Sequence, residues 1–70
     1  AAFSDRRLKK DYGVVAKTDS GIDLHLYRFK GEDARDPLRL GVMADEVEKV
    51  KPWAVKTHSS GLKVVDYARL

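Results

Sequence analysis

One short segment near the N-terminus holds the side chains best suited to chemistry. The stretch Ser4-Asp5-Arg6-Arg7-Leu8-Lys9-Lys10 combines one hydroxyl with four basic groups. A serine hydroxyl is a weak nucleophile that needs a base beside it, and a lysine amine acts as a base only when it is neutral. Burial and nearby cations both lower a lysine pKa. The cations that could lower the pKa of Lys9 are Arg6, Arg7 and Lys10.

The same residues also have ordinary structural interpretations. Ser4 is a preferred residue type for capping the N-terminus of a helix, and Lys9 could be solvated like most lysines. The basic cluster could contact phosphates. No aromatic platform or groove-reading helix accompanies the cluster. A small basic nucleic-acid-binding module therefore stands only as an alternative of a different class, and no nucleic-acid partner is expected.

The other reactive side chains give no comparable pattern. The sequence has no cysteine, and its two histidines, His25 and His58, lie far apart and are expected at the surface or in turns. Asp45 and Glu46 fit the solvated first turn of a helix, where the helix dipole favours carboxylates. We therefore expect no metal, no cofactor and no small-molecule substrate.

Length and composition limit the chain to one small domain, residues 1–70. A core of this size supplies only about 3–5 kcal/mol of stability, to which disulfides, metals or oligomerisation usually add. Because cysteine is absent, oligomerisation is the expected support. The net charge of +3 is modest. No apolar run approaches the roughly 18 residues of a membrane span, and no signal-peptide pattern is visible, so no membrane partner is expected.

Hydrophobic spacing and turn residues predict an α+β fold with short antiparallel strands, hairpins and one or two short helices. A first helical turn is expected from Ser4 to about Lys10, capped by Ser4, after an N-terminal tail of residues 1–3. Pro52 should end a second helix that spans residues 44–50. The predicted strands are 14–15, 22–29, 38–43, 53–57 and 62–67, and the last two form a hairpin.

Apolar residues in three places are candidates for the core. One set shares a face of the second predicted strand by period-two alternation: Ile22, Leu24 and Leu26. Another set forms a stripe on the predicted second helix: Met43, Val47 and Val50. Trp53 and Tyr67 are typical core or interface anchors.

Three stretches of the sequence resemble, in order and approximate spacing, the opening, middle and closing blocks of one protein family. They are residues 4–10, residues 41–47 followed by Pro52, and residues 61–67. The family is the C-terminal intramolecular chaperone domain of phage tail spikes and endosialidases. The resemblance implies a homotrimer that brings three copies of an upstream fibrous region of the same polypeptide into register. It also implies a location in a phage tail fibre within the virion, or in the bacterial cytoplasm during assembly.

In members of this family that cleave themselves, a serine attacks the peptide bond before it and a lysine five residues later is the base. The resemblance assigns these roles to Ser4 as nucleophile and Lys9 as general base, with Phe3–Ser4 as the bond that is cut. Such a domain is a serine peptidase that acts once on its own chain. A non-cleaving structural trimerisation cap is the alternative. Relatives usually continue into a C-terminal helix beyond the position of Leu70, so we expect that helix to be lacking.

The spacing of Ser4 and Lys9 restricts how their side chains can meet. Five residues along a regular helix turn through about 500°, which leaves the two side chains about 140° apart around the axis. On a strand, an odd offset puts them on opposite faces. Either a turn bends the segment, or the pair forms only after the trimer assembles, which would make cleavage wait for assembly.

Overall fold

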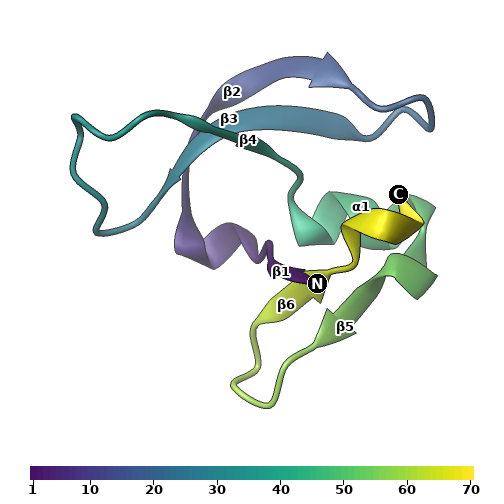
Figure 1. The fold of residues 1–70 in the computed structure, drawn as a ribbon. Helices are drawn as coiled ribbons and strands as arrows, with labels where there is room; N and C mark the ends of the chain where they lie inside the picture. The colour runs from purple at the N-terminus through teal and green to yellow at the C-terminus, as the bar shows by residue number, and fades with distance from the viewer.

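The computed structural model describes residues 1–70 as two three-stranded antiparallel sheets with one α-helix between them (Figure 1). The larger sheet has the order β2-β3-β4, with β2 at Lys9–Lys17, β3 at Asp23–Phe29 and β4 at Arg39–Gly41. The smaller sheet has the order β1-β6-β5, with β1 at Ala2–Phe3, β6 at Lys63–Val65 and β5 at Val55–Thr57. The helix, α1, spans Ala44–Val50, and 3-10 turns lie at Arg6–Leu8 (η1), Pro52–Ala54 (η2) and Tyr67–Arg69 (η3). The predicted α+β class is confirmed.

The larger sheet is built around a hairpin whose turn is marked in the sequence. Gly21 has a φ of +83°, and its N–H donates to the carbonyl of Thr18 at 2.9 Å, so the chain reverses there between β2 and β3. β2 is much longer than the predicted strand 14–15. It runs through Gly13, whose φ of +115° accompanies an irregularity in the pairing with β3. Apart from Lys9, every residue of β2 is exposed.

The hydrophobic core gathers around α1 and the smaller sheet. Its buried members are Ile22, Val42, Ala44, Val47, Ala54, Val55 and Val65. Met43 and Val47 confirm two of the three positions in the predicted helical stripe, but Val50 is exposed at the end of α1. Burial of a few medium-sized side chains gives a small core, as the chain length predicted.

Two other predicted core sets are confirmed only in part: Ile22 is buried in the core and Leu24 packs against it, but their other members are not buried. On β3 the fully buried side chains are His25 and Tyr27, whereas Leu24 and Leu26 on the opposite face are half-buried. The reason is that α1 and the side chain of Lys9 cover the face of β3 that carries His25 and Tyr27. Trp53 is 56% exposed, because η2 buries Ala54 instead, and Tyr67 is 41% exposed. Neither is a core anchor, and a role at an interface stays a prediction.

The smaller sheet confirms the predicted hairpin and corrects the N-terminus. β5 and β6 pair antiparallel on either side of the turn at residues 58–61, although both strands are shorter than predicted. The predicted N-terminal tail is wrong for Ala2 and Phe3, which pair with Val65 and Val64 of β6. No helix in the structure is both long and apolar enough to cross a bilayer.

Candidate functional site

Ser4 is buried between β1 and η1. Its N–H donates to the carbonyl of Lys63 at 3.1 Å, and its carbonyl accepts from the N–H of Ala44 at 2.8 Å. Ser4 is only 1% exposed, yet its Oγ has no hydrogen-bond partner. A buried polar group without a partner costs about 1–3 kcal/mol of desolvation. The hydroxyl is therefore not explained by a contribution to stability.

The predicted capping role of Ser4 is wrong, because the next residue takes that role. Asp5 is the N-cap of η1, and its carboxylate accepts from the backbone N–H of Arg7 at 2.9 Å. The same carboxylate accepts two bonds from the Arg7 guanidinium and one from the N–H of Lys63. These bonds, those from Arg7 foremost, hold the pKa of Asp5 well below its usual range. The helical turn also ends earlier than predicted, at Leu8.

Lys9, the first residue of β2, is buried instead of solvated. The residue is 4% exposed, and its Nζ donates to the carbonyl of Val42 at 2.8 Å. The same Nζ lies 4.0 Å from the centre of the Tyr27 ring. Burial lowers the pKa of Lys9 from 10.5 to about 8, because an ammonium group loses hydration in the interior. About a tenth of the molecules would then carry a neutral Lys9 at pH 7.

Ser4 and Lys9 are held against the same short segment of the chain. Ser4 bonds to Ala44 and Lys9 bonds to Val42, so both lie on the stretch 42–44 that leads into α1. The bend that their spacing requires is supplied by η1, which lies between them. The Ser4 hydroxyl is not hydrogen-bonded to the Lys9 amine. The fold thus bonds the backbone of the predicted nucleophile and the side chain of the predicted base to one segment, and their catalytic roles stay predictions.

The three cations predicted to tune the base have other neighbours. Arg7 pairs with Asp5 at 2.9 Å, and Arg6 pairs with Asp45 at 3.2 Å. Lys10 lies 5.4 Å from the centre of a tyrosine ring. Burial, not these charges, is the cause of the lowered pKa of the candidate base, so a tuning role stays a prediction. Pairing of both arginines also leaves little free positive charge for a nucleic-acid phosphate.

The carbonyl of Phe3, at the bond predicted to be cut, faces the open edge of the smaller sheet. β1 is the edge strand, and Phe3 lies opposite Val64 of β6. The bond from Ser4 N–H to Lys63 carbonyl makes that neighbouring pair the hydrogen-bonded one. In an antiparallel ladder, the adjacent pair directs its N–H and C=O groups away from the partner strand. The peptide bond before Ser4 is therefore extended, and its carbonyl lies outside the ladder.

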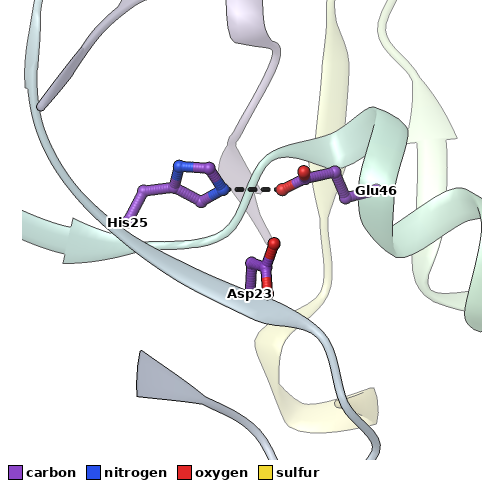
Figure 2. A group of neighbouring side chains, drawn as sticks. All are labelled: Asp23, His25 and Glu46. Atoms are coloured by element: carbon purple, nitrogen blue, oxygen red, sulfur yellow. Dashed lines mark hydrogen bonds and ion pairs between the residues drawn. The ribbon is translucent and has the colours of Figure 1, made fainter. Parts of the chain in front are cut away.

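The prediction that His25 lies at the surface or in a turn is wrong, whereas His58 is exposed in a turn as predicted. His25 is 3% exposed on β3, with Nδ1 3.0 Å from an Asp11 oxygen and Nε2 2.6 Å from a Glu46 oxygen (Figure 2). Burial favours the neutral ring, but the hydrogen bonds to Glu46 and Asp11 outweigh it and raise the pKa of His25. The two carboxylates come from β2 and α1, so their distance along the sequence gives no sign that they contact His25. The one sequence signal for a polar cluster here was the period-two spacing of Asp23 and His25, which puts both side chains on one face of a strand.

Comparison with known proteins gives one match. A family model for a peptidase family described as chaperone of endosialidase matches residues 4–56. The match begins at Ser4 and includes Lys9, α1 and the first residues of β5. Neither the curated proteins nor the solved structures give a significant match.

Proposed function

Because the chain belongs to the chaperone-of-endosialidase family, and so has the role of an intramolecular chaperone, we propose that it forms a homotrimer and cuts its own Phe3–Ser4 bond once. In this proposal, three copies bring the upstream region of a phage tail-fibre protein into register before cleavage releases them. The observation that carries the proposal is the buried Ser4 hydroxyl without a partner. The backbone of Ser4 is bonded to the same segment, residues 42–44, as a buried lysine whose pKa is lowered to about 8.

The chemistry begins with neutral Lys9 taking the proton of the Ser4 hydroxyl while Oγ attacks the carbonyl carbon of Phe3. The C–N bond of Phe3–Ser4 breaks, the proton passes to the Ser4 nitrogen, and an ester now joins Phe3 to the Ser4 oxygen. Water then hydrolyses this ester. The products are a carboxylate at Phe3 and a new N-terminal amine at Ser4. Lys9 has passed on the proton that it took and is again a neutral amine.

Two structural features support this sequence of steps. The extended backbone at Phe3 leaves its carbonyl outside the β1–β6 ladder, where an attacking oxygen meets no hydrogen-bonded strand. The Val42 carbonyl anchors the Lys9 amine at 2.8 Å. For catalysis, the lone pair of the neutral Lys9 amine must also reach the Ser4 hydroxyl, and the two groups are not hydrogen-bonded in the single chain. We propose that assembly of the trimer closes this contact.

The face proposed to meet other copies is the outer side of the larger sheet. Leu26 of β3 lies opposite Leu40 of β4, so both share one face. Leu40 is 58% exposed, and Leu26 is only half-buried. A second copy on this face would bury apolar area that the small core of a single chain leaves in water.

Mass spectrometry of the polypeptide that carries the upstream fibre tests cleavage. We expect the parent protein to yield two fragments that meet at Phe3–Ser4, and the Ser4→Ala variant to remain whole. Ser59→Ala changes an exposed serine and is the matched control, which should cleave normally. An intact parent protein, or a cleaved Ser4→Ala variant, would refute autoproteolysis and leave the non-cleaving cap.

Light scattering with size exclusion tests assembly on the same polypeptide. We expect a trimer, and we expect Leu40→Asp to yield monomers that are not cleaved, since assembly is proposed to close the Ser4–Lys9 contact. Thr57→Asp puts the same charge on β5 of the other sheet and should leave the trimer intact. Efficient cleavage in a monomeric Leu40→Asp sample would separate the two processes and contradict their coupling.

A further inference from the structure

A second group of polar side chains lies on β3 and α1, apart from the Ser4–Lys9 pair. His25 and Asp23 project from the same face of β3, and Glu46 reaches them from α1 (Figure 2). One ligand atom from each of the three residues lies within 4.8 Å of the others. The carboxylate of Asp23 points toward the gap between His25 and Glu46 in Figure 2. This is the donor set, one imidazole nitrogen and two carboxylate oxygens, that suits a borderline divalent ion.

The second ring nitrogen of His25 is already held as a metal-binding histidine requires. Both ring nitrogens face carboxylate oxygens, which can only accept: Nδ1 lies 3.0 Å from Asp11 and Nε2 lies 2.6 Å from Glu46. A metal ion at Nε2 would replace the proton there, and the bond to Asp11 would then keep the remaining proton on Nδ1. A carboxylate behind a ligating histidine is the common way in which proteins fix the tautomer and strengthen the ligand.

Charges around the three residues also favour a divalent cation. Four carboxylates take part in this network: Asp11, Asp23, Asp45 and Glu46. Only two permanent cations face them, Arg6 and Lys17. Leaving His25 aside, the four carboxylates and two cations therefore give the network two uncompensated negative charges. A divalent ion neutralises both, whereas a proton on His25 neutralises one.

We propose that Asp23, His25 and Glu46 bind a Zn²⁺ ion, with Asp11 as the carboxylate that orients His25. Zinc–ligand bonds of about 2.0–2.2 Å in a tetrahedral site place neighbouring ligand atoms about 3.4 Å apart. The 2.6 Å pair of His25 and Glu46 must open slightly, and an oxygen of Asp23 already lies within 4.8 Å of both. Both carboxylates are partly exposed and can rotate. Asp23 keeps its second oxygen for the metal while the first pairs with Lys17.

The site goes beyond the proposed cleavage and is independent of Ser4 and Lys9. The sequence predicted no metal because its two histidines are distant, and the structure supplies the missing ligands as carboxylates. Bound Zn²⁺ would fasten β3 to α1 and so link the larger sheet to the core. Any ligand that binds only the folded state stabilises it by mass action.

Titration of the chelator-treated 70-residue chain with Zn²⁺ alone, followed by calorimetry and thermal unfolding, tests this proposal. We expect one ion per chain and a rise in Tm on the order of 10 °C at a hundredfold excess over Kd. Asp23→Asn and Glu46→Gln change partly exposed residues, so the chain should still fold. Each should weaken binding at least about tenfold, as should Asp11→Asn.

His58→Gln removes the other imidazole, which is exposed, and should leave binding unchanged. Co²⁺ in place of Zn²⁺ should give visible absorption bands that disappear in Asp23→Asn. The proposal is overturned if the parent chain binds no Zn²⁺, if Asp23→Asn binds as tightly as the parent, or if His58→Gln abolishes binding. Mg²⁺ at millimolar concentration should not compete, since it prefers an all-oxygen, octahedral shell.

Discussion

Within residues 4–9, buried polar side chains differ sharply in how fully they are hydrogen-bonded. The carboxylate of Asp5 accepts four hydrogen bonds, from Arg7 and from the N–H of Lys63. The hydroxyl of Ser4, one residue earlier, has none. Lys9 has a single carbonyl partner for an ammonium that can donate three bonds. Buried polar groups in folded proteins are normally satisfied. The contrast therefore separates a part that holds the fold, at Asp5, from a part that is kept available, at Ser4 and Lys9.

The largest expected effect is on the rate of cleavage and comes from Lys9, the proposed base. The rate of cleavage should rise about tenfold per pH unit below pH 8 and level off above it, because the neutral fraction of Lys9 increases up to its pKa of about 8. Lys9→Arg keeps a positive charge that cannot be removed at working pH. It should slow cleavage by roughly 10²–10⁴-fold. Gel-based rates between pH 6 and 10 measure both effects, and a rate independent of pH below 8 would rule out Lys9 as the base.

The next largest expected effect is on stability and comes from Asp5, which holds the fold. Asp5→Ala leaves two partly buried backbone N–H groups and a guanidinium without their acceptor, and should lower the free energy of unfolding by about 3 kcal/mol. The chain contains its own control, since Asp33 makes the same three bonds to Arg35 on the exposed surface. Asp33→Ala should cost less than about 1 kcal/mol. Urea denaturation of both variants measures the difference, and equal losses would mean that burial of Asp5 adds nothing.

The smallest expected effect has the opposite sign and separates the two parts most directly. Ser4→Ala removes a buried hydroxyl without a partner, so stability should stay the same or rise by up to about 1 kcal/mol. A serine that capped a helix would instead lose about 1 kcal/mol on the same change. Urea denaturation of the 70-residue chain decides between the two signs. A clear loss of stability would return Ser4 to a structural role and weaken the case for its availability.

Local signals in the sequence predicted the elements that depend on local chemistry. The β5–β6 hairpin follows from a turn with Gly61, whose φ is +86°, and α1 ends before Pro52 as proline geometry requires. β1 could not be predicted, because two residues carry no periodic pattern and their partner, β6, lies at the other end of the chain. The cap was misassigned because serine and aspartate are both good caps, and only the fold shows which of the two reaches the Arg7 N–H.

The sequence predicted which residues form the candidate site, but it did not predict that their side chains are buried. A resemblance in the sequence pointed to Ser4 and Lys9, yet nothing in residues 4–10 indicates that both are buried. Their cover comes from Tyr27 on β3 and from the stretch 42–44, far along the chain. The same reason explains the error at His25, whose carboxylate partners lie on β2 and α1. Burial depends on how distant elements pack together. Hydrophobic patterns in the sequence do not predict it for polar side chains such as these.

The shortness of β1 has a consequence for what a cut at Phe3–Ser4 would do. While the chain is continuous, the covalent bond keeps β1 beside β6 at an effective concentration that can reach the millimolar range. After the cut, the same two-residue pairing would become an ordinary bimolecular equilibrium, in which so little contact gives no useful affinity at cellular protein concentrations. Dilution alone would then separate the pieces. The domain would be held to the upstream chain by the covalent bond and not by binding affinity. Hydrolysis of that one bond would therefore make its dissociation irreversible.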